Sequence, residues 1–442
     1  MRNILVLGAG KSSYHLIQYL LDNATSQNWH VTVADASLEN VIEKTNNHPS
    51  STAVQFDINN DDQRIFEIGK ADIVISLLPP AFHYVAALEC LNQNKNLVTA
   101  SYVSEQMKQL SAEVSKKGLI FLNECGLDPG IDHMSAMEII DDLKEKGAKI
   151  TGFKSYTGGL IAPESNDNPW GYKFTWNPKN VILAGQGTAR YLKDGNYKYT
   201  PYSRLFQETE KIKIDGLDVL DGYANRDSVS YKTIYNLTDI PSLLRGTLRY
   251  NGFCGAWNIF VQLGLTDDAY KIENSSSLTY AALVRSLLPV NTGNIKNDLK
   301  SFVPNANQDD LDRVFWTGIC EEKAIPLINA SPADILLHLL SEKWMLQKND
   351  IDLVAMQHII SYQLNQLNYT VKSSLIVKGQ NQTATAMSKT VGLPLAIAAK
   401  NILNATVNAS GVLIPINKDI YNPILKELEK FHISFVNETF SS

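Results

Sequence analysis

Reactive side chains gather in residues 123–134, where the chain reads NECGLDPGIDHM. Asp128 lies between Leu127 and Pro129 in this segment, and a carboxylate in a turn can accept and return protons. We expect a tight turn, because glycine admits unusual backbone angles and Pro129 pushes Asp128 out of the helical region. The apolar run LIFL comes directly before it. The sequence therefore predicts a polar, reactive turn at the end of a buried strand.

His133 and Cys125 belong to the same segment and can also titrate or react. Each has an ordinary structural interpretation. His133 falls in the first turn of a helix expected to begin near Ile131, and Cys125 suits a small apolar position at a strand end. No spacing of His, Cys and Asp favours a metal site, so no metal is expected.

A second candidate site is the sequence GAGKSS, residues 8–13, which follows the apolar run NILVL. Gly8 allows a turn, and Gly10 lets the backbone approach a pyrophosphate at the start of the next helix. A tight strand-to-helix turn needs glycine even without a nucleotide, but its place in the first strand-helix-strand unit favours dinucleotide binding. Ser13 occupies the third glycine position. The predicted cofactor contacts in this turn are Gly8, Gly10, Lys11, Ser12 and Ser13.

Asp35 ends the second apolar run. An acidic side chain at this point accepts hydrogen bonds from both hydroxyls of an adenosine ribose and repels a 2′-phosphate. The alternative is that Asp35 caps a helix formed by ASLENVIEK. The sequence therefore predicts NAD rather than NADP, with Asp35, Ala36 and Ser37 among the cofactor contacts.

The elements that must position these groups follow a regular alternation. Six short β-rich runs are separated by stretches in which apolar residues recur at helical spacing. This predicts an α/β fold, a doubly wound parallel sheet that binds ligands beyond the carboxyl ends of its strands. The six runs are residues 3–10, 30–35, 52–57, 71–79, 96–102 and 119–125.

The rhythm changes after about residue 130, where longer polar connections and expected strands such as KITGFKSYTGG and KTIYNL follow. We predict three parts, the first a dinucleotide-binding domain with its C-terminal helices packed back against it. The second is a mixed α/β substrate domain and the third is mostly helical. The predicted bounds are 1–130 with about 390–442, 131–261 with about 346–389, and 262–345.

The composition restricts the class of partner. The chain has 442 residues, 44% of them hydrophobic, and a formal charge of −6 without long basic runs. We therefore expect a small-molecule substrate rather than nucleic acid or a membrane. Four cysteines without a CxxC pair, and an N-terminus that does not read as a signal peptide, predict a reducing, cytoplasmic compartment.

Five segments together carry a family resemblance: NECGLDPGIDHM, the long stretch of residues 155–195 that contains DNPWGYKF, YANRDS, RGTLRYNGF and TVGLPLAIAAKNIL. They resemble saccharopine dehydrogenase, L-glutamate-forming, also called saccharopine reductase, over nearly the whole chain. The resemblance implies a variant Rossmann domain, a saccharopine-binding α/β domain and a mostly helical domain. It also implies reversible conversion of saccharopine to L-glutamate and 2-aminoadipate 6-semialdehyde with NAD(P), and a homodimer.

The resemblance assigns roles to single residues. Asp57 and Ile58 match adenine contacts, and Leu127, Asp128 and Pro129 match the nicotinamide site. Asp128 and Tyr102 are the candidate catalytic residues. The implied substrate contacts are Ser101, Tyr102, Asp128, Arg226, Thr247, Leu248 and Arg249. One departure is that fungal biosynthetic members carry an arginine after the second strand for the 2′-phosphate of NADP, where this chain has Asp35 and Ala36.

Each of these roles has a plainer alternative. A substrate with three carboxylates calls for arginine, whose planar fork binds carboxylates with two hydrogen bonds. Arg226, Arg245 and Arg249 lie close in sequence, but such clusters usually pair with acids on a solvated surface. The resemblance favours Arg226 and Arg249 over Arg245. Asp128 can instead form a local turn before Pro129, and Tyr102 can be a buried crevice residue.

Two other functions stay open at this point. A carboxynorspermidine dehydrogenase would keep the fold and the imine reduction but use a different amine. A regulator that binds NAD without turnover would keep only the cofactor site, since fold does not establish activity. DNPWGYKF and the arginine-bearing motifs favour the three-carboxylate substrate. The sequence leaves open whether the reaction runs toward lysine or away from it.

Overall fold

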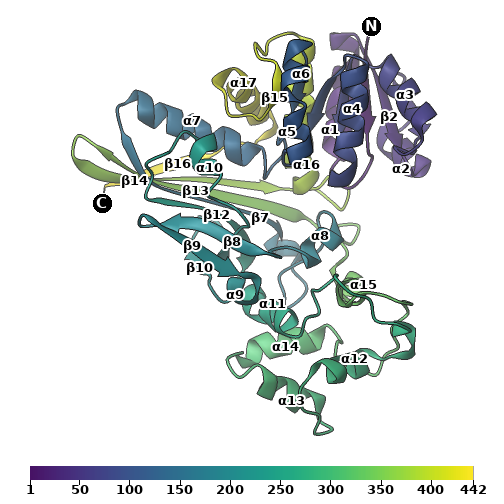
Figure 1. The fold of residues 1–442 in the computed structure, drawn as a ribbon, viewed down its shortest axis with the longest axis vertical. Helices are drawn as coiled ribbons and strands as arrows, with labels where there is room; N and C mark the ends of the chain where they lie inside the picture. The colour runs from purple at the N-terminus through teal and green to yellow at the C-terminus, as the bar shows by residue number, and fades with distance from the viewer. Residues whose placement is uncertain (442) are drawn as a thin grey trace. The chain divides into compact units, whose positions relative to one another are not determined.

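The chain divides into two compact units in the computed structural model, which describes residues 1–441. The first unit comprises residues 1–149 and 375–437, so the C-terminal helices belong with the N-terminal part of the chain. The second comprises residues 150–374 and those from 438 to the end of the described chain. Figure 1 follows the chain from its N-terminus to its C-terminus. Each unit is built around its own sheet.

The first unit contains a seven-stranded sheet with the order β15-β6-β5-β4-β1-β2-β3. Every neighbouring pair in this sheet is parallel. The order reverses between β1 and β4, which is the switch point where doubly wound sheets bind ligands. The prediction of this fold class from the sequence is confirmed. The strands are β1 (Arg2–Leu7), β2 (Trp29–Asp35), β3 (Ser51–Gln55), β4 (Ile73–Ser76), β5 (Asn96–Thr99), β6 (Ile120–Leu122) and β15 (Gly411–Leu413).

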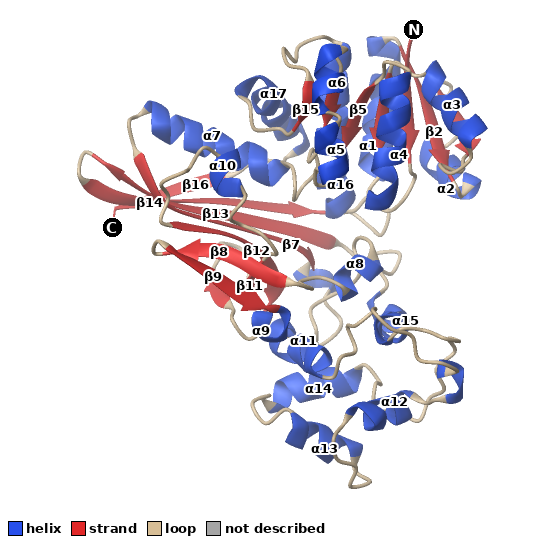
Figure 2. Ribbon diagram, viewed as in Figure 1, coloured by secondary structure: helices blue, strands red, loops and turns tan. Residues whose placement is uncertain are grey.

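Helices cover this sheet (Figure 2). One core contains side chains of the strands together with Ile68, Ala87 and Val114 from three of the helices. Elsewhere α16 packs on α1 so closely that a Cβ on Gly392 would lie 2.8 Å from the backbone nitrogen of Leu16. The helices are α1 (Tyr14–Gln27), α2 (Leu38–Thr45), α3 (Asp61–Lys70), α4 (Pro80–Asn92), α5 (Glu105–Gln109), α6 (Ser111–Lys116), α7 (Ile131–Glu145), α16 (Ala386–Leu403) and α17 (Lys418–Leu428).

The second unit contains a nine-stranded mixed sheet with the order β10-β11-β12-β7-β13-β14-β16, and β8 and β9 attached through β12. β12 is parallel to β7 and antiparallel to β11. This places residues 245–249 of β12 in the middle of the sheet. The strands are β7 (Lys149–Ile161), β8 (Thr188–Lys193), β9 (Asn196–Pro201), β10 (Glu210–Ile212), β11 (Leu220–Ala224), β12 (Ser242–Tyr250), β13 (Asp352–Leu364), β14 (Leu367–Lys378) and β16 (Val436–Ser441).

Helices of the second unit form a core rich in aromatic rings, with Trp170, Trp257 and Trp344 all buried in it. Phe253 stacks on Trp257 with ring centroids 5.4 Å apart. The longer elements here are α11 (Phe253–Gln262), α12 (Tyr280–Leu287), α13 (Ile295–Phe302), α14 (Gln308–Trp316) and α15 (Pro332–Trp344), and the shorter ones are α8 (Pro178–Ile182), α9 (Tyr202–Leu205) and α10 (Tyr231–Ile234). Short 3-10 turns of this unit lie at Pro163–Ser165 and Ser275–Ser277, and another, Glu429–Phe431, belongs to the first unit.

The prediction of a strand at KTIYNL is wrong, because this segment contains α10. The side chain of Asp227 accepts hydrogen bonds from the backbone N–H groups of Val229 and Ser230, which starts a helical turn. Tyr231 and Tyr235 are both buried and their rings touch, with centroids 5.5 Å apart. Residues four apart share one face of a helix, so burial of this pair outweighs the β-propensity of the segment.

Among the described residues, no helix combines the length and the hydropathy needed to cross a bilayer.

Candidate active site

The glycine turn follows β1 at the carboxyl edge of the parallel sheet. Gly8 has a φ of 104°, and a Cβ there would lie 3.0 Å from the backbone of Leu77, so only glycine fits. Gly10 is different, because a Cβ on it would meet no atom within 4 Å. Packing within the protein therefore does not require glycine at this position. The open space beside Gly10 suits the close approach of a pyrophosphate to the backbone.

Ser13 stabilises the turn through a hydrogen bond of its buried side chain. Its side chain is fully buried, and its hydroxyl donates a hydrogen bond to the carbonyl of Gly10 at 2.8 Å. Lys11 is exposed and Ser12 is half-buried. α1 begins at the next residue, Tyr14, so its amino end faces the turn. This is the arrangement in which a helix N-terminus receives an anion.

Asp35 lies at the end of β2 and binds the same turn. Its carboxylate accepts a hydrogen bond from the backbone N–H of Ala9 at 2.6 Å and from that of Ser37 at 2.8 Å. The alternative that Asp35 caps the next helix is wrong, since Ser37 is the N-cap of α2. Lys44, which sequence reasoning missed, donates to the carbonyl of Ala9 from α2. Asp35 is therefore placed beside the glycine turn, with Ala36 exposed next to it.

Asp57 and Ile58 follow β3. Asp57 is exposed, and its carboxylate accepts a hydrogen bond from the backbone N–H of Asn59 at 2.9 Å. Ile58 is buried, and its carbonyl accepts from Arg64 at 3.0 Å. Both residues lie at the carboxyl end of a strand, although the structure gives each of them a local structural role as well.

The reactive turn after β6 is held by buried polar groups. The carboxylate of Glu124 accepts from the backbone N–H of Val103 at 3.0 Å and lies 2.8 Å from the Nε2 atom of His133. Glu124 has a φ of 53°, a left-handed conformation that such a side chain rarely adopts. Gly130 closes the turn, since a Cβ there would lie 2.0 Å from the carbonyl oxygen of Gly126. His133 and Glu124 thus clamp the turn in place, and sequence reasoning missed the pair because nothing in the spacing links them.

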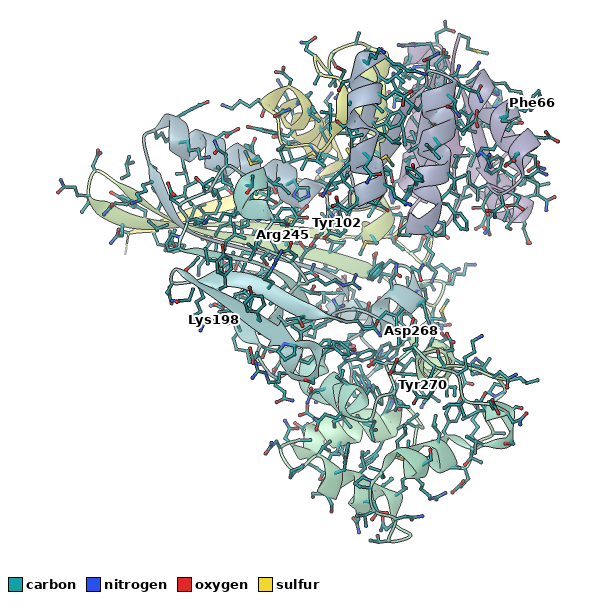
Figure 3. The ribbon with its side chains drawn as sticks, in the orientation of Figure 1. Phe66, Tyr102, Lys198, Arg245, Asp268 and Tyr270 are labelled. Carbon is teal, nitrogen blue, oxygen red and sulfur yellow. The ribbon has the colours of Figure 1, made fainter. Side chains whose placement is uncertain are left out.

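Asp128 and Tyr102 meet in this region. The Tyr102 hydroxyl donates to Oδ1 of Asp128 at 3.1 Å, and the peptide bond between Asp128 and Pro129 is cis. Tyr102 is 48% exposed, so it is not the buried tyrosine of the alternative interpretation (Figure 3). Leu127 and Pro129 on either side of Asp128 are buried. The structure therefore brings together a carboxylate and a phenol that both reach the surface of the first unit.

Ser101 lies directly before Tyr102 and is half-buried. Its hydroxyl lies 2.7 Å from Nε2 of His83, a residue of α4 that the sequence did not single out. The backbone carbonyl of Ser101 accepts from the N–H of Glu124 at 3.1 Å. The segment after β5 and the reactive turn after β6 are thereby fixed to each other.

The three clustered arginines of the second unit differ in their surroundings. Arg226 follows β11 and is exposed. Arg245 is buried, with its guanidinium 4.0 Å from the centre of the Tyr231 ring. Arg249 is 4% exposed and lies among the rings of Tyr172, Tyr223 and Phe253, with the guanidinium carbon 5.2 to 6.0 Å from their centres. The alternative of a solvated surface cluster is therefore wrong for the last two.

Arg249 carries a buried charge without a carboxylate partner among the described residues. Its Nη1 donates to the carbonyl of Leu248 at 2.9 Å, and its Nε has no hydrogen-bond partner. Burying an ion without a counter-ion is costly, so a carboxylate brought to Arg249 would lower that cost. Thr247, half-buried, and Leu248, fully buried, precede it on β12. A guanidinium in this state is suited to a ligand carboxylate.

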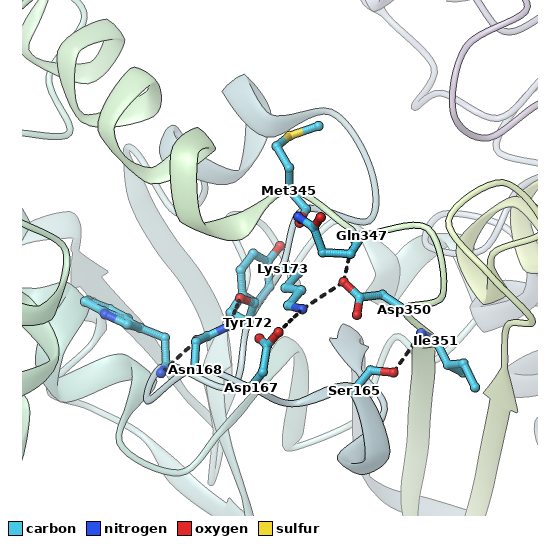
Figure 4. A network of polar contacts seen from close by, with 10 residues as sticks. Ser165, Asp167, Asn168, Tyr172, Lys173, Met345, Gln347, Asp350 and Ile351 are labelled. Carbon is cyan, nitrogen blue, oxygen red and sulfur yellow. Dashed lines mark hydrogen bonds and ion pairs between the residues drawn. The ribbon is translucent and has the colours of Figure 1, made fainter.

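A polar network supports the aromatic wall beside Arg249 (Figure 4). Lys173, almost fully buried, lies 2.8 Å from carboxylate oxygens of both Asp167 and Asp350. Burial alone would lower the pKa of Lys173, but the hydrogen bonds to both carboxylates raise it above its ordinary value. The backbone carbonyl of Tyr172, the residue before Lys173, accepts from Asn168 at 3.0 Å. The DNPWGYKF segment thus positions the Tyr172 ring against Arg249.

Comparisons with known proteins cover almost the whole chain. Residues 4–122 match the saccharopine dehydrogenase NADP binding domain, and residues 126–433 match the saccharopine dehydrogenase C-terminal domain. Saccharopine dehydrogenase [NADP(+), L-glutamate-forming] of Pyricularia oryzae is 34% identical over 98% of both chains. Alpha-aminoadipic semialdehyde synthase of Bos taurus is also 34% identical, over 99% of this chain and 48% of that protein. The apo saccharopine dehydrogenase (L-Glu forming) structure from Saccharomyces cerevisiae has a TM-score of 0.89 and 31% identity, with both chains fully covered.

The parallel sheet with its glycine turn, together with these matches, defines an NAD(P)-dependent oxidoreductase. The chain belongs to the L-glutamate-forming saccharopine dehydrogenase family.

Proposed function

We propose that this protein converts saccharopine, NAD(P)+ and water reversibly into L-glutamate, 2-aminoadipate 6-semialdehyde and NAD(P)H in lysine metabolism. The observation that carries the proposal is the end-to-end match to relatives whose names state this reaction. The chemistry of the chain agrees with it, because a buried guanidinium without a counter-ion suits a substrate that carries three carboxylates.

Substrate binding is proposed to rest on Arg249 and Arg226. Arg249 offers Nε to a carboxylate from within aromatic walls, where the low dielectric strengthens a charged hydrogen bond. Arg226 offers an exposed guanidinium. Thr247 and Leu248 contribute backbone groups, and Ser101 contributes its hydroxyl. Arg245 is left out of the substrate contacts.

The proposed chemistry needs a group that can move protons. A bound nicotinamide would supply the acceptor for the hydride on the carbon beside the substrate nitrogen. Asp128 takes the proton from that nitrogen, directs water onto the imine carbon and returns a proton to nitrogen as the carbinolamine collapses. The Tyr102 hydroxyl orients the Asp128 carboxylate through the 3.1 Å hydrogen bond. One carboxylate can thus act in each proton-transfer step.

For the cofactor we propose NAD in preference to NADP. Asp35 stands at the end of β2, where a 2′-phosphate would meet its negative charge, and Ala36 beside it supplies no cation. The relatives with NADP(+) in their names argue the other way. The proposed ribose contacts are Asp35, Ala36 and Ser37, and the pyrophosphate contacts are Gly8, Gly10, Lys11, Ser12 and Ser13.

A homodimer, which rests on family resemblance, and a cytoplasmic location, which rests on the cysteine usage of the chain, complete the proposal. Light scattering during size-exclusion chromatography should give a mass of two chains, and a mass of one chain would remove the dimer without affecting the proposed reaction.

One assay tests the reaction. Purified protein is mixed with saccharopine and either NAD+ or NADP+, and reduced nicotinamide, glutamate and the semialdehyde are quantified. Turnover with saccharopine but not with carboxynorspermidine supports the proposal. The reverse preference identifies an imine reductase on a different amine, and saturable NAD+ binding without turnover identifies a regulator.

A further inference from the structure

His83 joins two serines at neighbouring strand ends in the first unit. Its Nδ1 lies 2.8 Å from the hydroxyl of Ser76, the last residue of β4, and its Nε2 lies 2.7 Å from the hydroxyl of Ser101, after β5. The hydroxyl of Thr99 is more distant from the ring, at 3.3 and 3.4 Å. The ring itself is buried in α4. A histidine therefore reaches from the interior to one of the proposed substrate contacts.

The imidazole ring is neutral in this position. Burial lowers the pKa of His83 to about 4, and the ring nitrogens form their hydrogen bonds with the hydroxyls of Ser76 and Ser101. A neutral imidazole has one nitrogen that donates and one that accepts. The hydrogen-bond chain from Ser76 through His83 to Ser101 therefore runs in one of two directions, and the direction decides which side of the Ser101 hydroxyl faces a ligand.

We propose that His83 is a positioning residue that carries its proton on Nε2 and thereby turns the Ser101 hydroxyl into a hydrogen-bond donor for a substrate carboxylate. This inference rests on the proposed function, in which Ser101 contacts saccharopine. The Ser76 hydroxyl then donates to Nδ1, Nε2–H donates to the Ser101 oxygen, and the Ser101 proton points to the substrate.

The opposite direction would fail chemically. If Nδ1 carried the proton, the Ser101 hydroxyl would donate to Nε2 and its single proton would be consumed within the protein. The serine would then present only lone pairs to a carboxylate, which accepts hydrogen bonds and donates none. A hydrogen bond to a charged group would be exchanged for repulsion between oxygens. A substrate with three carboxylates therefore favours the Nε2–H form.

Two substitutions at His83 test the contacts of the two ring nitrogens separately. His83→Asn is long enough to replace Nδ1 and accept from Ser76, but it does not reach Ser101. His83→Gln extends an amide N–H toward the position of Nε2 and can still donate to Ser101. The pair is matched in polarity, so a difference between them reports the Ser101 contact rather than loss of a buried polar residue. Thermal unfolding and NAD(P)+ binding are measured on both variants as controls.

The measured quantities are KM for saccharopine and kcat, in each variant and again in a Ser101→Ala background. We expect His83→Asn to raise KM about tenfold with little change in kcat or cofactor affinity, the size of one hydrogen bond to a charged group. His83→Gln should stay within about threefold of the parent, and the two variants should become equal when Ser101 is alanine. Equal KM in the two variants, or a difference that persists without Ser101, would overturn the proposal.

A second measurement requires neither turnover nor a folded variant, because it is made on the unmodified protein. The ¹⁵N NMR shifts of the His83 ring in the unmodified protein distinguish a protonated from an unprotonated nitrogen. Protonated Nε2 and unprotonated Nδ1 are expected, and protonation of Nδ1 alone would overturn the inference. If the parent does not turn over saccharopine, the proposed function fails while this measurement still decides the orientation of the ring.

Discussion

The turn after β6 and the middle of β12 both contain buried charged side chains, but they differ in how those groups are satisfied. In the turn, Glu124 accepts from Val103 and contacts His133, so the protein itself supplies the partners. On β12, Arg249 is equally buried, yet its Nε has no partner and it has no carboxylate counter-ion among the described residues. Satisfied groups of the first kind hold a backbone in place. A group of the second kind can gain a hydrogen bond from a ligand, and this is the basis for proposing Arg249 as a substrate contact.

The largest expected effect comes from removing the incomplete charge. Arg249→Met should raise KM for saccharopine by about a hundredfold or more, since a buried charged hydrogen bond is lost. The same change should leave the unfolding temperature unaltered or higher, because an uncompensated buried ion is replaced by an apolar side chain of similar length. Steady-state kinetics and thermal unfolding on the same preparation measure both. A fall in stability with unchanged KM would show that Arg249 has a structural role, as Glu124 does, and does not bind saccharopine.

The matched change in the turn should behave in the opposite way. Glu124→Ala removes the partner of His133 and Val103 and should lower the free energy of unfolding by about 3 kcal/mol. In the fraction that stays folded, KM for saccharopine should change much less than in Arg249→Met. Urea unfolding gives the stability. Normal stability combined with lost activity would place Glu124 among the reacting groups.

An effect on kcat rather than on KM is expected at the pair formed by Asp128 and Tyr102. Asp128→Asn should lower kcat by about a hundredfold, the usual contribution of a general base, and Tyr102→Phe by only a few-fold. The Tyr102 substitution should have the smaller effect on kcat, because Tyr102 is proposed to act by orienting Asp128. Measurements of kcat in saturating substrate decide it, and a Tyr102→Phe loss equal to that of Asp128→Asn would make the tyrosine the proton-transfer group.

A modest effect is predicted on cofactor choice. Ala36→Arg places a cation beside the end of β2 and should raise kcat/KM for NADP+ by about tenfold relative to NAD+, the size of one phosphate contact. Ala36→Gln is the uncharged control. If the parent already prefers NADP+, Asp35 does not exclude a 2′-phosphate and its role is confined to the hydrogen bonds from Ala9 and Ser37.

The sequence predicted the parallel sheet because its strands are continuous apolar runs between amphipathic helices, a pattern that is read locally. β15 was missed because it has only the three residues Gly411–Leu413, too few to show a period, and it pairs with β6 far away in the chain. The prediction of a strand at KTIYNL was wrong because burial of tyrosine in α10 outweighs the local β-propensity. Local sequence patterns therefore do not predict elements that are very short or whose conformation is set by tertiary packing.

The candidate site likewise contains residues that the sequence predicted and residues that it did not. Gly8, Gly10 and Asp35 were predicted from a motif with fixed spacing, and the structure places them beside one another at one end of the sheet. His83 and Glu124 were missed because their partners, Ser101 and His133, are fixed by the fold and not by any spacing. That Arg249 lacks a counter-ion could not be foreseen either, since absence of a partner is a property of the packed structure.

The most direct test of the account is the product analysis of saccharopine oxidation. Saccharopine has two carbon–nitrogen bonds at its secondary amine, and the proposed reaction breaks the one that releases glutamate. Glutamate, semialdehyde and reduced nicotinamide are expected in equal amounts from the purified protein. Reduced nicotinamide accompanied by lysine and 2-oxoglutarate, or no reduction at all, would contradict it.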